Sequence, residues 1–170
     1  MNTSLNPIGD SFVDLMEQLV GQYRRLADLL LQEEQAIVAF SVQAFHRVRE
    51  EKQIQVVRIQ AIDSKRKVFL KKLAAEFGIP AASLTLSKIA ERLEAPLAER
   101  IRHLSAELKA VLDIVVERNQ KNDNLIGYSL ALIRSSIDFL THLMIPAPVY
   151  GKNGGVVPSK GSGLRLRSMA

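Results

Sequence analysis

Apolar side chains recur along the first 40 residues in alternating steps of four and three positions. This spacing places them on one face of a helix and is typical of a heptad seam. It predicts a helix over about residues 10–43, with Asp10 or Ser11 as its N-cap and with Pro7 and Gly9 outside it. The seam positions are Phe12, Met16, Leu19, Tyr23, Leu26, Leu30, Glu33, Ile37 and Phe40.

A second and weaker series predicts another helix over about residues 44–77. Gly78 and Pro80 end it, because glycine accepts a left-handed cap and proline cannot continue a helix. A turn near Ser41 is favoured over one continuous helix, because two helices of this length bury their seams against each other. The second seam is Phe45, Val48, Lys52, Gln55, Ile59, Ile62, Arg66, Phe69 and Leu73.

The remaining helical pattern predicts a short helix over about residues 87–94 and a long one over about 96–144. Ser87 is expected to cap the short helix, and Pro96 suits the first turn of the long one. The long helix has the third seam of the chain. Its positions are Leu97, Ile101, Leu104, Leu108, Val111, Val115, Arg118, Asn122 and Leu125.

Prolines and glycines gather after this last helix, in residues 146–170. Such a composition cannot form a packed core and predicts a flexible tail, which leaves one helical domain over residues 1–145. No strand is predicted. The expected fold class is all-α: an elongated antiparallel bundle, or coiled-coil-like hairpin, of long helices with a flexible C-terminal tail.

Most of the net charge of +5 comes from the predicted tail. Four basic residues and no acid follow residue 145, and the rest of the chain is nearly neutral at +1. A short basic tail attracts any polyanion weakly, and the 5% aromatic content with no tryptophan offers few rings for base stacking. We therefore predict no nucleic-acid partner. The absence of cysteine also excludes disulfides and thiolate chemistry.

Little in the sequence points to catalysis. The three histidines lack the spacing of a metal site, and no glycine-rich phosphate loop is present. Three charged residues on the seams, Glu33, Lys52 and Arg66, either line a polar pocket between helices or form an interhelical ion pair that fixes register. We predict no enzymatic activity, no catalytic residue, no metal and no cofactor.

The most informative stretch is 125–145, whose only charged residues are Arg134 and Asp138. Two apolar stripes coexist there, and their combined arc is too wide for one neighbouring helix. The stretch is wrapped by the first helix and the connector, spans a membrane, or is covered by a partner protein. Charge makes stable membrane insertion costly, so we expect a mixture of internal wrapping and a partner-covered surface. The stripes are Leu125, Leu132, Phe139 and Leu143, and Ile126, Leu130, Ile133, Ile137, Leu140 and Met144.

Four short elements follow one another along the chain. They are Glu33-Glu34, Glu50-Glu51-Lys52, the run Asn119-Gln120-x-Asn122-x-x-Leu125-Ile126, and Val149-Tyr150-Gly151 with Gly154 three residues on. On pattern alone, the asparagine run predicts a polar layer or a bend in the last helix. Taken together within an all-α frame of this size, the four elements resemble the FlgN family of flagellar export chaperones. Longer helices and a Gly-Ser-basic end distinguish this chain from the family pattern.

The resemblance implies a cytoplasmic chaperone of bacterial flagellum assembly. Such a chaperone binds the hook–filament junction proteins FlgK and FlgL before type III export and delivers them to the export gate protein FlhA. The resemblance also implies that the last helix and the tail bind substrate, and that Tyr150, with Gly151, contacts the gate. The predicted substrate-binding residues are Asn119, Asn122, Leu125, Ile126, Leu130, Ile133, Ile137, Leu140 and Met144.

A second reading is a coiled-coil adaptor or structural protein with no export role. Under that reading, deletion of residues 146–170 leaves partner binding intact. The pattern leaves open whether the chain forms a homodimer.

Overall fold

The structure, a computed structural model, describes residues 5–144, 149–150 and 156–157, with side chains for residues 8–142. It confirms the predicted all-α class. The chain divides into two compact units, residues 1–126 and 127–170. The elements are α1 (Leu5–Val38), α2 (Val42–Phe77), the 3₁₀ helix η1 (Ala81–Ser83), α3 (Leu86–Ala90), α4 (Ala95–Met144), β1 (Val149–Tyr150) and β2 (Val156–Val157).

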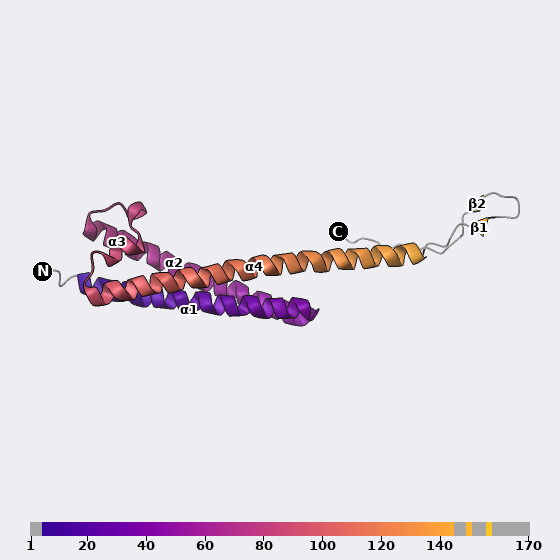
Figure 1. Ribbon diagram of the computed structural model, residues 1–170, viewed down its shortest axis with the longest axis horizontal. Helices are drawn as coiled ribbons and strands as arrows, with labels where there is room; N and C mark the ends of the chain where they lie inside the picture. The colour runs from indigo at the N-terminus through magenta and orange to yellow at the C-terminus, as the bar shows by residue number, and fades with distance from the viewer. Residues whose placement is uncertain (1–4, 145–148, 151–155, 158–170) are drawn as a thin grey trace. The chain divides into compact units, whose positions relative to one another are not determined.

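In the first unit, α1, α2 and the amino-terminal part of α4 lie side by side as a three-helix bundle (Figure 1). The chain reverses direction after α1 and again through the connector that contains α3, so α4 runs parallel to α1. Two ion pairs of 2.7 Å record this direction: Glu17 pairs with Arg100, and Glu34 pairs with Lys121. Residues early in α1 therefore meet residues early in α4, and late residues meet late ones.

The three predicted seams meet in one hydrophobic core. Phe12 of α1, Leu73 of α2 and Ile101 of α4 are all buried, and Ile89 of α3 closes the core at the connector. Burying each side chain of this size contributes about 1.5–3 kcal/mol. The 3–4 spacing is therefore satisfied within the chain as far as Leu125, which is half-buried.

Helix α1 begins at Leu5, five residues earlier than predicted, and it includes Pro7 and Gly9. Proline is tolerated there because the amide groups of a first helical turn have no acceptor within the helix. Gly9 is buried, and a Cβ on it would lie 3.1 Å from Leu97 Cδ1, so the glycine lets α1 and α4 approach closely. Asp10 is already inside the helix and is not its cap.

The predicted turn near Ser41 is confirmed, although α1 ends at Val38 rather than near residue 43. Phe40, expected on the seam, has a positive φ of 51° and is 67% exposed. The amides of Phe40 and Ser41 donate to the carbonyls of Ile37 and Ala36, each at 3.0 Å, which is a Schellman motif. Gly78 ends α2 in the same way with a φ of 63°, so Phe40 stands where glycine is the favoured residue.

Replacing Phe40 by glycine is expected to stabilise the protein by about 1 kcal/mol, because the left-handed conformation strains any residue with a Cβ. Gly78→Ala should lower the free energy of unfolding by a similar amount, because the added Cβ meets no atom within 4 Å and only backbone strain changes. Urea unfolding of the two variants and the parent measures both effects. A destabilising Phe40→Gly beside a destabilising Gly78→Ala would show that the Phe40 ring contributes to folding despite its exposure.

The cap of α3 and the presence of two short strands also differ from what the sequence predicts. Thr85, not Ser87, caps α3, with its hydroxyl accepting a 3.3 Å bond from the amide of Lys88. The β1 and β2 strands pair antiparallel, with Val149 opposite Val157. Valine favours the extended backbone, which explains strands of two residues where none was predicted. The expected flexibility of the other residues in 146–170 lies outside the described residues.

Candidate protein-binding site

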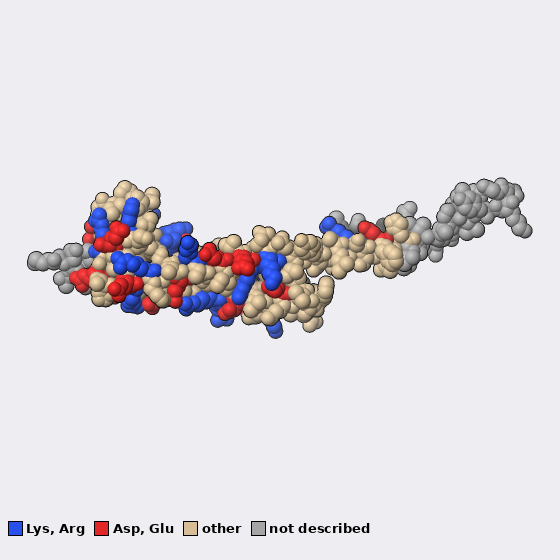
Figure 2. All heavy atoms as spheres, in the orientation of Figure 1, with Lys and Arg blue, Asp and Glu red and all other residues tan. Residues whose placement is uncertain are grey.

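The second half of α4 exposes more large apolar side chains than any other helical stretch of comparable length among the described residues. Each of seven such side chains in residues 127–142 is at least 49% exposed. Figure 2 shows this part of the helix largely free of charge, whereas acidic and basic groups are interspersed over the bundle. The seven residues are Tyr128, Leu130, Leu132, Ile133, Ile137, Phe139 and Leu140. We call this set the apolar surface.

Six of the seven residues of the apolar surface lie in two seams on one helix, and Tyr128 lies outside both. Leu132 and Phe139 continue the heptad positions by which α4 packs into the bundle, because they lie seven and fourteen residues after Leu125. The second seam, in which apolar residues recur in alternating steps of four and three positions, begins only at Ile126. Arg134 lies on the remaining, polar side of the helix, together with other exposed polar residues. We expected other helices of the chain to cover part of this stretch. The seven large apolar side chains within residues 127–142 are instead highly exposed.

Membrane insertion was the second of the three explanations for this stretch. Within the described part of the chain, no helix combines the length and the apolar character that a membrane crossing requires. Exposed apolar side chains gathered in this number are typical of a surface that another polypeptide covers.

All nine predicted substrate-binding residues lie on α4, and their side chains differ in exposure. Leu125 and Ile126 are half-buried, at the end of the first unit, and the apolar members from residue 130 to residue 140 are exposed. The side chains of Met144 and Tyr150 and the whole of Gly151 lie outside the described residues. Their predicted roles stay predictions.

Asn122 and Asn119 occupy opposite environments. Asn122 is 1% exposed and donates its amide to the carbonyl of Leu30 at 2.8 Å and to Glu33 Oε2 at 2.9 Å. Asn119 is exposed and bonds Asp123 on its own helix at 3.3 Å. The predicted polar layer is therefore present at Asn122, and this residue joins α4 to α1 inside the bundle.

A buried polar cluster holds the three long helices together at this level. Lys52 Nζ of α2 lies 2.6 and 2.7 Å from the two carboxylate oxygens of Glu33, which is only 2% exposed. Asn122 of α4 completes the cluster, and its Oδ1 is a buried oxygen without a hydrogen-bond partner. Of the two alternatives for the charged seam residues, the interhelical ion pair is confirmed for Glu33 and Lys52.

Arg66, the third charged seam residue, pairs within its own helix. Its guanidinium bonds Asp63, which Lys67 also contacts at 3.0 Å. Partial burial acts to raise the pKa of Asp63, but the hydrogen bonds from Lys67 and Arg66 and their positive charges together hold that pKa below its ordinary value. The interaction supports α2 locally and does not join helices.

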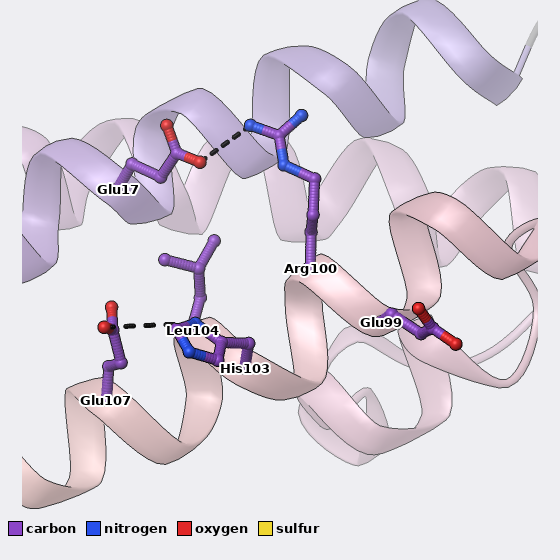
Figure 3. Close-up of a pocket in the computed structure, with 6 residues that line it drawn as sticks. All are labelled: Glu17, Glu99, Arg100, His103, Leu104 and Glu107. Atoms are coloured by element: carbon purple, nitrogen blue, oxygen red, sulfur yellow. Dashed lines mark hydrogen bonds and ion pairs between the residues drawn. The ribbon is translucent and has the colours of Figure 1, made fainter.

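A surface hollow of about 480 Å³ lies between α1 and α4, and four of the residues that line it form two pairs, whereas Glu99 points away from both (Figure 3). Arg100 donates to Glu17 at 2.7 Å, and His103 lies 3.9 Å from Glu107. These pairs join α1 to α4 or brace α4 itself, which is a structural use of the charges. Among the described residues, no group of three or more acidic or histidine side chains is placed to hold a metal ion.

Comparison with known proteins adds one finding to this geometry. A family model described as FlgN protein matches residues 8–158, which is most of the chain. The chain belongs to the FlgN family. Membership supports a role as a chaperone in flagellar assembly. No curated protein and no solved structure matches.

The FlgN family match spans both the buried polar cluster and the apolar surface. The sequence singled out Glu33, Lys52 and Asn122 in three separate elements and offered an interhelical ion pair between charged seam residues as one alternative, but it did not predict that Asn122 joins that pair. The sequence feature that could have revealed the cluster is that all three residues lie on otherwise apolar seams. A polar residue on such a seam is costly to bury alone, so polar residues on neighbouring seams can be expected to find one another.

Proposed function

We propose that this FlgN-family chain is a cytoplasmic chaperone that binds the hook–filament junction proteins FlgK and FlgL before export and delivers them to the export gate protein FlhA. The observation that carries the proposal is the apolar surface of α4, with seven large side chains each at least 49% exposed. Family membership supplies the flagellar context. In this role the chain acts by binding and release, without enzymatic activity or a cofactor.

The binding step follows from the two seams. An amphipathic segment of the junction protein docks along residues 127–142 and covers both seams, leaving the polar side with Arg134 in water. Removal of apolar area from water contributes about 25 cal/mol per Å² before the costs of association. Ordering a disordered segment forfeits several kcal/mol of that energy, which keeps the complex releasable at the export apparatus.

Asn122 serves this function as a positioning residue rather than a contact. Its amide is committed to Leu30 and Glu33 inside the bundle, where a substrate has no access in this conformation. It anchors α4 to α1 a few residues before the apolar surface begins. Asn119, which is exposed, keeps its proposed place at the edge of the substrate-binding region.

Delivery to the gate is assigned to Tyr150 with Gly151. A tyrosine ring brings a large contact area with only two side-chain torsions to fix, so a single residue can contribute much to a weak docking event. This step uses a different residue from substrate binding, and the two steps can be separated by mutation.

Tyr150→Ala is expected to leave the affinity for purified FlgK unchanged and to weaken docking to the cytoplasmic domain of FlhA roughly tenfold or more, because the ring's contact area is lost. Tyr150→Phe is the matched control and should retain most of the docking, since it keeps the ring. Titration of full-length variants against each partner separates the two steps. Unchanged gate docking by Tyr150→Ala would refute the gate assignment, and failure of the parent chain to bind FlgK would refute the proposed substrate.

A further inference from the structure

Helix α2 has a second row of apolar positions on the side away from the core. Ile54, Val57 and Val68 are between 53% and 59% exposed, and Ala61 and Ala75 are exposed in the same row. Their spacing repeats every seven residues: Ile54, Ala61, Val68 and Ala75 form one series, and Val57, Ser64 and Lys71 form the other. These are the two inward-facing positions of a heptad, so the row, which we call the outer seam, has the geometry of a coiled-coil interface.

One edge of the outer seam is uniformly basic. Arg58, Lys65 and Lys72 lie seven residues apart, each directly beside the apolar row, and all three are exposed. No ion pair involves any of them among the described residues. Between Gln53 and Ala75 the chain has six basic residues but one acid, Asp63, and this acid is already bound by Arg66 and Lys67.

We propose that the outer seam docks one amphipathic helix of a partner protein, whose apolar stripe is flanked by aspartate or glutamate. The partner's apolar residues pack against Ile54, Val57 and Val68, and its acidic residues pair with the basic edge, as flanking charges do in coiled coils. The seam from Ile54 to Ala75 is about 32 Å long at 1.5 Å per residue, which accommodates three heptads of a partner helix.

The shape of the outer seam favours a helix over an anionic membrane. A helix that lies in a membrane interface buries a broad apolar face, usually with aromatic residues. The outer seam is a narrow row of aliphatic side chains without an aromatic residue, and Phe69 packs against the core instead. Charge complementarity therefore selects an acidic helix. The polar residues Ser64 and Lys71 within the seam make the contact weak and reversible.

The outer seam is also distinct from the surface proposed for junction proteins, because it is formed by α2 rather than α4. A chaperone with two such surfaces can hold its substrate on one helix while a second protein engages the other. The inference stands on the exposure and charge of α2 and does not require that FlgK or FlgL is the substrate.

The test uses a designed helical peptide of roughly three heptads, with isoleucine and leucine in its seam and glutamate on both flanks. Fluorescence anisotropy at physiological ionic strength measures its binding to the full chain. Binding of this peptide, with binding by neither a composition-matched scrambled peptide nor a lysine-flanked version, is the expected result. Binding of the scrambled peptide as tightly as the designed one would overturn the proposal, because charge alone would then suffice.

The double substitution Lys65→Glu with Lys72→Glu should lower the affinity for the acidic peptide roughly tenfold. It should also create binding of the lysine-flanked peptide. Arg102→Glu with Lys109→Glu, an equal charge change on exposed residues of α4, is the matched control and should do neither. Equal effects of the two pairs would overturn the proposal. So would failure of the acidic peptide to bind while vesicles of equal phosphatidylserine and phosphatidylcholine bind the parent chain, since that result identifies a membrane-binding face.

Discussion

Replacing Ile133 and Ile137 by aspartate is expected to abolish capture of FlgK while the protein stays fully helical. The two side chains are 49% and 55% exposed in the free chain, so the substitutions remove little folding energy. In the complex they would place two carboxylates in an apolar contact, which costs several kcal/mol and loses the burial of two isoleucines. The affinity for FlgK, measured by titration calorimetry, should therefore fall by roughly a hundredfold or more.

The same helix offers a matched control for this change. Gly127→Asp with Ala131→Asp introduces two carboxylates at the same four-residue spacing on the polar side of α4, where both parent residues are exposed and a Cβ on Gly127 meets no atom within 4 Å. This variant should bind FlgK like the parent. Circular dichroism distinguishes a failed surface from a failed fold: a loss of helicity in the isoleucine variant, or an equal loss of binding in the control, would contradict the assignment of the apolar surface.

Lys52→Met is expected to destabilise the bundle by about 3 kcal/mol. It removes the cation that lies 2.6 Å from Glu33 and leaves a carboxylate that is 97% buried with one remaining donor, Asn122. Breaking one side of a buried pair is costly because the other charge loses its compensation and water cannot replace it. Urea unfolding, with the slope of the transition as a check on two-state behaviour, gives the free energy of unfolding.

Two further variants distinguish the stability cost of leaving a buried charge unpaired from the cost of losing an ion pair in general. Lys121→Met breaks a pair of similar length, 2.7 Å to Glu34, but its lysine is 58% exposed and the expected loss is below 1 kcal/mol. Glu33→Leu combined with Lys52→Met should recover most of the stability, since both charges are then gone and Asn122 keeps its bond to the Leu30 carbonyl. Equal losses for Lys52→Met and Lys121→Met would contradict this account.

The sequence predicted the seams well because the 3–4 spacing of apolar residues is a direct consequence of helix geometry. Met16, Ile59 and Ile101 are on the core face as expected. The ends of α1 were less predictable. Pro7 and Gly9 are residues that usually lie outside helices, and only the close approach of Leu97 explains the glycine. Phe40 continues the seam by its spacing, but a Schellman motif turns the chain away before that position.

The candidate site was predictable in part for the same reason. The width of the apolar arc on α4 follows from the sequence, so the surplus around Ile133 and Ile137 was foreseen, whereas the absence of internal cover in the described residues required the fold. The contact between Glu33 and Lys52 depends on how α1 and α2 are aligned after the turn at Ser41. A pattern along one helix carries no information on that alignment.

The length of α4 lowers the entropy cost of ordering the apolar surface for binding. A short isolated helix is marginal in water, because its first turn must be nucleated at the expense of several fixed torsions. Residues 127–142 avoid that step, since α4 starts at Ala95 and its first turns are secured by the packing of Leu97 and Ile101. The backbone of the apolar surface is thus propagated from a folded template, and on association the loss of chain entropy falls mainly on the incoming polypeptide.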